Sequence, residues 1–269
     1  MRKILITFGG RAYDERTKEL VERAPCLGAD DVWVYDDLWL TNTEFYRRNS
    51  WLWEHHGDLQ NVKRGFGWFA WKSIIIQDAL SRLETGDMLL YLDGDTHPIS
   101  DFSMLYDECH RIGGMMFFEA QGCVQAHWCK RDCFIVMAQD EPRYHNAQHA
   151  VARFMLFEKG SHQADDFLGE WAAYCVNPLA TTFDPSVLGK PELPGFQEHR
   201  TEQAIMTNLV HKYGLPLYRE ACQFGDHGTK SRDLYPQTLF HQVGVPRHAH
   251  EARPIDGSRY RNVPARYAK

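Results

Sequence analysis

The sequence predicts a single α/β domain in which a mixed, mainly parallel sheet is flanked by helices. Three observations lead to this fold class. Short apolar runs alternate with amphipathic segments through the first half of the 269 residues, as in strands joined by crossover helices. An amphipathic segment at residues 72–83 is followed by an uninterrupted apolar run at residues 88–92. That run leads directly into Asp93-Gly94-Asp95, and the carboxyl end of a buried strand is where α/β sheets bind ligands.

The first half divides into elements at clear start and stop signals. Strand-length apolar runs occur at residues 4–8, 32–35, 88–92 and 115–118. Helical patterns occur at residues 14–24, 72–83 and 101–111. Asp14 can cap the first helix, Pro25 follows it, and Gly86 follows the second. The second helix has its apolar residues on one face at a period of 3.6, namely Ile75, Ile76, Ala79, Leu80 and Leu83.

The second half is less regular. Helices are expected at residues 163–175 and 202–212, each with apolar residues on one face. Residues 177–196 are rich in proline and glycine and are expected to form a long loop, which in a compact domain is often functional. Beyond Tyr213 the chain is polar, so we expect it to follow the surface as a tail.

Composition and charge restrict the class of protein. The formal net charge of −6 gives no electrostatic reason to expect a nucleic-acid backbone as the main partner, although a local patch could still bind a nucleic-acid acceptor. The seven cysteines are scattered, and no second pair completes a zinc site with Cys129 and Cys133, so we interpret them as reduced thiols. The N-terminal apolar run of about five residues is too short for a signal-peptide core, and no later run approaches the ~20 apolar residues of a membrane span. The sequence therefore predicts a soluble, cytoplasmic protein, with peripheral membrane contact left open.

Asp93 and Asp95 are the strongest candidates for a metal site. Two carboxylates separated by one glycine, held at the end of a rigid strand, suit Mn²⁺ or Mg²⁺, which prefer oxygen ligands and share them with substrate phosphates. The alternative is an ordinary solvated turn, for which Asp93-Gly94 is a normal dipeptide. The long apolar strand before the pair favours the metal site.

Several segments resemble a group of GT-A-type glycosyltransferases with a DxD motif. The resemblance starts at residues 65–98, GFGWFAWKSIIIQDALSRLETGDMLLYLDGDTHP, with a Gly-X-Gly-aromatic run, Trp-Lys, a helix, a strand and the acidic pair. It continues in order through WCKRDCF, FLGEWAAYCVNP, LPGFQEHRTEQAI and YPQTLFH. The chain departs from the group where Thr201-Glu202-Gln203-Ala204 replaces His-Asp-Gln-Ser. It also has Ser73 in place of proline, and only His241-Gln242 where the group has His-His-Arg.

The resemblance implies a GT-A-like, Rossmann-like nucleotide-binding fold and a metal-dependent transfer of sugar from a nucleotide-sugar donor. A UDP-sugar is the first choice of donor, and the acceptor is an unidentified glycan, small molecule or polymer. Residues 1–120 would bind the nucleotide sugar and metal, and residues 121–269 would form the acceptor half and the C-terminal tail. The metal ligands would be Asp93, Asp95 and a C-terminal histidine, for which His241 is the first candidate and His227 the second.

Other residues are candidates for binding the donor. The resemblance implies that the loop after the first strand binds the nucleotide, through Thr7, Phe8 and Gly9 and, at the phosphate, Arg11. Lys72, at the start of a helix, could meet a diphosphate as a point charge, and Trp71 could line a sugar or base pocket. Each has a plainer alternative: a strand-to-helix turn for the loop, a solvated side chain for Arg11, and core packing for Trp71.

The segment around Glu202 is the candidate for acceptor chemistry. Glu202 could act as general base for an acceptor hydroxyl or could bind the transferred sugar, and it could equally be a first-turn acid that suits a helix N-terminus. The neighbouring residues His199, Arg200 and Gln203 are weaker candidates for contacts with acceptor or phosphate. Two other functions stay open: a metal-dependent nucleotidyltransferase or sugar-phosphate hydrolase, and a non-catalytic carbohydrate-binding protein on a transferase scaffold.

Overall fold

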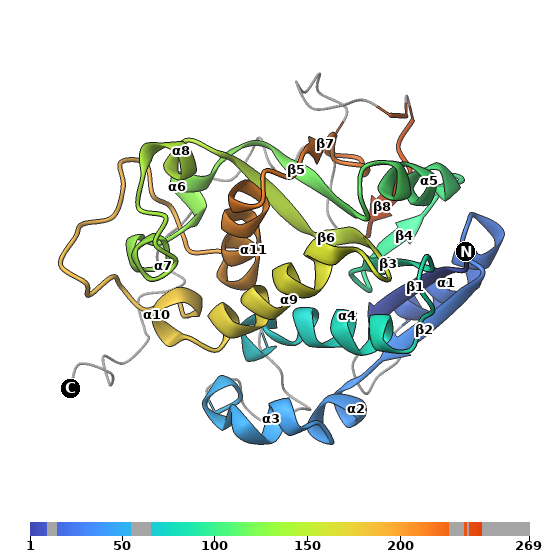
Figure 1. Cartoon of the computed structure of the whole chain (residues 1–269), viewed down its shortest axis with the longest axis horizontal. Helices are drawn as coiled ribbons and strands as arrows, with labels where there is room; N and C mark the ends of the chain where they lie inside the picture. The colour runs from blue at the N-terminus through green and yellow to red at the C-terminus, as the bar shows by residue number, and fades with distance from the viewer. Residues whose placement is uncertain (10–14, 55–65, 226–233, 236, 244–269) are drawn as a thin grey trace.

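The computed structural model describes residues 1–9, 15–54, 66–225, 234–235 and 237–243. One six-stranded sheet lies at its centre, with the strand order β2-β1-β3-β6-β5-β7 (Figure 1). The strands span β1 (Lys3–Phe8), β2 (Asp31–Tyr35), β3 (Met88–Leu92), β5 (Met115–Val124), β6 (Gln148–Glu158) and β7 (Leu217–Tyr218). β1 pairs in parallel with β2 and β3, as β5 does with β7, while β6 is antiparallel to both its neighbours. The predicted mixed, mainly parallel sheet is therefore confirmed.

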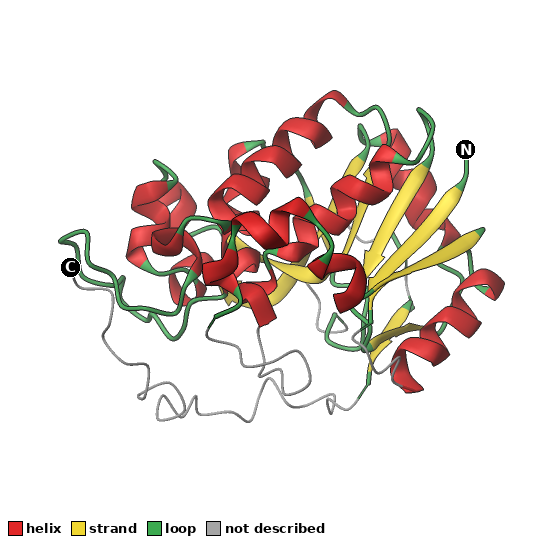
Figure 2. Ribbon diagram, turned by 90° about the horizontal axis from the view of Figure 1, so that it is seen from below, coloured by secondary structure: helices red, strands yellow, loops and turns green. Residues whose placement is uncertain are grey.

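Helices pack on both faces of this sheet (Figures 1 and 2). One face packs against α4 (Trp71–Ser81), α9 (His162–Cys175) and α11 (Thr201–Lys212). The other face packs against α1 (Glu15–Arg23) and α5 (Ser103–Arg111). The shorter helices are α2 (Asp37–Thr41), α3 (Glu44–Arg48), α6 (Gln125–Trp128), α7 (Arg131–Val136), α8 (Pro142–His145), α10 (Pro178–Thr181) and the 3₁₀ segments Ala24–Cys26, Ser50–Leu52 and Phe66–Phe69.

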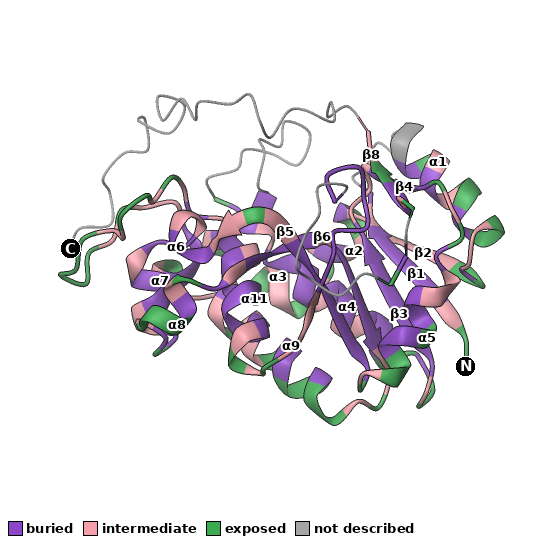
Figure 3. Ribbon diagram, turned by 90° about the horizontal axis from the view of Figure 1, so that it is seen from above, coloured by how far each residue is buried: buried purple, intermediate pink, exposed green. Residues whose placement is uncertain are grey.

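The central strand β3 explains why its sequence is continuously apolar. β3 lies between β1 and β6, and all five of its residues are buried (Figure 3). Leu89 and Tyr91 pack into the core beneath α4, while Leu90 and Leu92 pack into the core beneath α5. A strand covered on both faces has no polar face to alternate with, so its sequence reads as an apolar run. This burial holds the end of β3 rigidly in place.

Strand β6 was not expected, and it completes the centre of the sheet. Its sequence, QHAVARFMLFE, has an arginine within an apolar run and no helical or alternating period. The strand inserts between β3 and β5, where both faces are covered. Because β6, like β3, is covered on both faces, its sequence lacks the alternation of apolar and polar residues by which strands are usually predicted.

One expectation about the second half holds in large part and one was wrong. Outside the short helix α10, residues 177–196 form the expected loop, which Asp132 of α7 holds by accepting bonds from Val187 N at 2.7 Å and Leu188 N at 3.0 Å. The chain beyond Tyr213 is not a surface tail in its described part. β7 adds to the sheet edge, Ala221 and Cys222 are fully buried, and β8 (Phe240–Gln242) pairs with β4 (Thr96–Pro98). None of the helices in the described part of the chain is long and apolar enough to cross a membrane.

Candidate active site

A cleft of about 460 Å³ opens where β1 and β3 end. Its walls come from the end of β1, the start of α4, the Asp93-Gly94-Asp95 turn, the middle of β6, residues 198–203 and Gln242. The carboxyl ends of parallel strands are where open α/β sheets bind ligands. The cleft draws on both proposed halves of the chain, and the division into a donor half and an acceptor half stays a prediction.

The acidic turn is held by backbone bonds on both sides. Asp93 N donates to Arg153 O of β6 at 2.8 Å, and Val243 N donates to Asp95 O at 2.8 Å. Between them, Gly94 packs tightly: a Cβ there would lie 3.0 Å from Thr17 Oγ1 and 3.2 Å from Phe8 O. A side chain at this position would therefore require Thr17 or the end of β1 to shift.

Each aspartate already has protein partners. Tyr91 Oη donates to Asp93 Oδ1 at 2.5 Å, and the ammonium of Lys72 lies 3.0 Å from the same oxygen. Gln242 Nε2 donates to Asp95 Oδ2 at 3.1 Å. The side chain of Asp93 remains 31% exposed, so its carboxylate is accessible from the cleft.

The residues present fit a divalent cation that takes most of its ligands from substrate phosphates and water. No group of three or more histidine, cysteine, aspartate or glutamate side chains within the described ranges could hold a metal ion. Mg²⁺ is commonly bound through one or two carboxylates together with substrate phosphates and water. Asp93 and Asp95 would be those carboxylates. The charge of the cleft also suits a bound cation, because carboxylates outnumber cationic side chains in its lining. The carboxylates are Asp93, Asp95, Glu198 and Glu202, and the cations are Lys72, Arg153 and Arg200.

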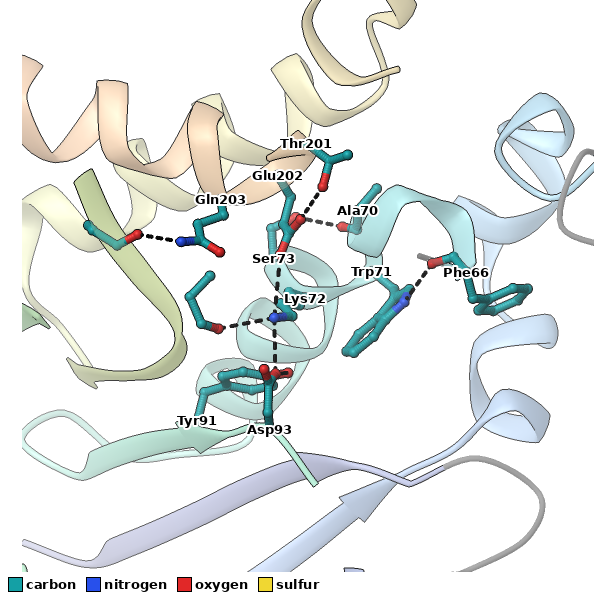
Figure 4. Close-up of polar contacts among 12 residues, drawn as sticks. Phe66, Ala70, Trp71, Lys72, Ser73, Tyr91, Asp93, Thr201, Glu202 and Gln203 are labelled. Atoms are coloured by element: carbon teal, nitrogen blue, oxygen red, sulfur yellow. Dashed lines mark hydrogen bonds and ion pairs between the residues drawn. The ribbon is translucent and has the colours of Figure 1, made fainter. Parts of the chain in front are cut away.

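Lys72 lies at the centre of the site (Figure 4). Its ammonium donates to Ala152 O at 3.0 Å and forms ion pairs with Asp93 Oδ1 at 3.0 Å and Glu202 Oε1 at 3.3 Å. Burial alone lowers the pKa of this ammonium, but the two carboxylates outweigh it and the net pKa is raised. These three contacts occupy all three N–H donors of the ammonium. To bind a phosphate, the role predicted for Lys72, the ammonium would have to give up one of these acceptors.

Removing Lys72 is expected to destabilise the fold. In Lys72→Met the buried carboxylate of Glu202 loses its cation, and breaking such a pair costs about 3–5 kcal/mol. The matched control is Lys212→Met, because Lys212 pairs with Glu170 at 2.5 Å on the surface and such pairs contribute at most about 1 kcal/mol. Urea unfolding of both variants measures the difference. Equal losses in the two variants would contradict a buried ion-pair role for Lys72.

Glu202 enters the cleft from the first turn of α11. It is 3% exposed, and Thr201 Oγ1 donates to its Oε2 at 2.5 Å. Burial raises the pKa of Glu202, and the Lys72 ammonium offsets only part of this effect. Thr201 has a φ of 45°, which is a strained conformation for a β-branched residue. Strain of this kind concentrates at functional sites, and here it lies where α11 directs Glu202 towards Lys72.

The end of β1 forms a second wall of the cleft. Phe8 stacks on Trp71 with ring centroids 4.1 Å apart, and both residues line the cleft. Gly9 N donates to Tyr35 O at 2.8 Å, which ties the end of β1 to β2. The buried Thr7 Oγ1 has no hydrogen-bond partner among the described residues. Arg11 lies outside those residues, and the donor-binding roles of this group stay predictions.

The residues next to Glu202 are largely committed to other contacts. His199 is buried, with Nε2 donating to Ala180 O at 2.7 Å and Nδ1 accepting from Lys130 N at 3.2 Å. Burial lowers the pKa of His199 well below its usual value, so its ring is neutral at pH 7. Arg200 pairs with Glu198 at 2.8 Å and lies over the ring of Trp128. Gln203 donates to Ala150 O, which anchors α11 to β6, and all three candidates line the cleft.

The residue of β8 that meets the acidic turn is Gln242. Successive side chains of a strand point to opposite sides, so Gln242 contacts Asp95 while its neighbour His241 is exposed. His241 does not line the cleft in this arrangement, and its role as a metal ligand stays a prediction. His227, the second candidate, lies outside the described residues.

Several residues that line the cleft were not singled out as candidates from the sequence, and three of them carry chemistry or shape the walls. Phe69 and Phe183 are aromatic wall residues, and Arg153 is a cation on β6. Phe69 and its neighbour Trp68 have φ values of 58° and 54°, which are uncommon for residues other than glycine. The sequence signal for Arg153 was a charge inside the apolar run of β6, since such a charge must find a partner or a ligand.

No protein-family model and no curated protein matches this chain. Solved structures do resemble it. The apo form of mouse xyloside xylosyltransferase 1 is 10% identical, with a TM-score of 0.51 covering 91% of this chain and all of that one. The apo structure of the bifunctional glycosyltransferase WbbM is also 10% identical, with a TM-score of 0.50 covering 82% of this chain and 39% of that one. This chain therefore has the GT-A-like fold that the sequence predicted.

Proposed function

We propose that this protein is a metal-dependent glycosyltransferase that moves a sugar from a nucleotide-sugar donor to an acceptor hydroxyl. One observation carries the proposal. Asp93, at the end of β3, and Glu202, at the start of α11, both contact the Lys72 ammonium in one cleft. In this proposal the first carboxylate would bind the donor through the metal and the second would act in transfer. The similarity in fold to a xylosyltransferase and to WbbM supports the same class.

In this proposal Asp93 and Asp95 hold Mn²⁺ or Mg²⁺ against the donor diphosphate. The cation would supply electrostatic stabilisation of the nucleoside diphosphate as it leaves. The Phe8–Trp71 stack would bind the nucleotide, with a UDP-sugar as the first choice. Glu202 would accept the proton of the acceptor hydroxyl or bind the transferred sugar, provided that the acceptor approaches along the wall formed by Phe69 and Phe183.

Thermal unfolding with a panel of nucleotide sugars and Mn²⁺ tests the proposal. A donor present at about 100 times its Kd is expected to stabilise the protein by about 2.7 kcal/mol, because it binds the folded state only. The same sugars without metal serve as the control, and they should give a smaller shift. No shift with any nucleotide sugar would contradict the proposed donor class.

Product analysis then separates the alternatives. A glycosyltransferase hydrolyses its donor slowly in the absence of acceptor and releases the nucleoside diphosphate. A nucleotidyltransferase or a sugar-phosphate hydrolase would give different phosphate products, and a carbohydrate-binding protein would leave the donor intact. Release of nucleoside monophosphate or inorganic phosphate, or an intact donor after prolonged incubation, would count against the transferase.

A further inference from the structure

Arg153 is a cation of the cleft whose guanidinium is only partly used by contacts within the fold. It lies in β6 opposite the acidic turn, since its carbonyl accepts the bond from Asp93 N. The register of β6 against β5 shifts between Val151 and Leu156, and Arg153 falls inside this irregular stretch. Such bulges re-aim side chains and occur next to active sites. Here Arg153 lines the cleft, and its side chain is 18% exposed.

The guanidinium is held in place from one side. Nη1 pairs with Glu220 Oε1 at 3.0 Å and lies 3.5 Å from Cys222 Sγ, while the guanidinium carbon lies 5.3 Å from the ring centroid of Phe224. Within the described part of the chain, Nε and Nη2 have no hydrogen-bond partner. Neither nitrogen is fully buried, so both remain accessible to solvent. A guanidinium has five N–H donors in a fixed fork, and most of this fork is unused.

The other two cations of the cleft are more fully occupied. All three N–H donors of Lys72 have acceptors, and Arg200 is paired with Glu198 and stacked on Trp128. Arg153 is thus the cleft cation best able to accept a new anionic partner. A planar guanidinium binds two phosphate oxygens at once, which a lysine ammonium does not.

We infer that Arg153 binds the diphosphate of the donor, with Glu220 and Phe224 positioning its guanidinium. The inference rests on the proposed function. Arg153 lies across the ladder from Asp93, so an anion held there would be next to the acidic turn and its cation. The same contact would offset the charge that grows on the leaving diphosphate. If the Arg153–Glu220 pair only joins residues 219–225 to the sheet, its loss should affect stability and leave ligand preference unchanged.

The test compares binding of a nucleoside diphosphate with binding of its nucleoside. UDP, GDP, ADP and CDP are first titrated into the wild-type protein with Mn²⁺ by calorimetry, and the tightest is kept together with its nucleoside. The variants are Arg153→Lys, Glu220→Gln and the double variant Arg153→Met/Glu220→Gln. The double variant leaves no unpaired buried carboxylate, and thermal unfolding verifies that each variant is folded.

We expect the double variant to bind the diphosphate roughly 10- to 100-fold more weakly, the range for losing charge-assisted hydrogen bonds, while nucleoside affinity stays within about 2-fold. Arg153→Lys should give an intermediate loss, and Glu220→Gln should keep the preference for diphosphate. An unchanged ratio of diphosphate to nucleoside affinity in the double variant would overturn this inference and would leave the proposed function standing. If no nucleoside diphosphate binds the wild-type protein, the proposed function fails and this inference fails with it.

Discussion

Replacing Glu202 with glutamine is expected to lower turnover by roughly 10²–10⁴ while donor affinity stays near the wild-type value. That range is typical for the loss of a general acid or base. Glutamine keeps the shape of the side chain and its bond from Thr201, but removes the charge that would accept a proton. Steady-state kinetics with donor and acceptor, together with calorimetry of donor binding, measure the two effects separately.

Glu170→Gln is the matched control. Glu170 is also an ion-paired glutamate, bound by Lys212 at 2.5 Å, but it lies on α9 outside the cleft. Its replacement should leave turnover unchanged. If Glu202 were only the buried ion-pair partner of Lys72, its substitution would cost stability and would not affect turnover. Near-wild-type turnover in Glu202→Gln would therefore remove the proposed catalytic role.

The second large effect is expected at the acidic turn. Asp95→Asn should weaken binding of the nucleoside diphosphate in the presence of Mn²⁺ by more than roughly 100-fold, because even groups that only support a metal ligand contribute 10- to 100-fold to metal affinity. Asp93→Asn should have the same effect. It should also cost stability, because Asp93 is bonded to Tyr91 and Lys72. Asp95→Asn is the cleaner variant.

Calorimetry with and without Mn²⁺ measures this effect, and circular dichroism verifies the fold. Asp107→Asn serves as the control, since that carboxylate lies on α5 with 66% of its side chain exposed and pairs only loosely with Lys3 at 3.4 Å. It should bind the nucleoside diphosphate as the wild-type protein does. Metal-independent, unchanged binding in both Asp93→Asn and Asp95→Asn would refute the assignment of the metal site.

The sequence alone was enough for the fold class and the place of the acidic turn. Residues 88–92 were expected to form a buried strand and residues 72–83 a helix, and the structure has β3 and α4 there. These elements are encoded locally, by an apolar run and by a 3.6-residue period. Asp93 and Asp95 directly follow the apolar run, so the sequence also predicted that they lie at the carboxyl end of a central strand. Ligands reach α/β sheets at these ends.

Only the tertiary structure decided which side chains meet there. Lys72 could be predicted to start a helix, but its carboxylate partners come from β3 and from α11, which lie far apart in the chain. Gln242 rather than His241 contacts Asp95 because the register of β8 against β4 fixes which side chain faces the turn. Arg153 enters the cleft because β6 inserts next to β3 and shifts its register against β5. Strand order and register depend on contacts between distant segments, and a one-residue change in register moves every side chain to the other face.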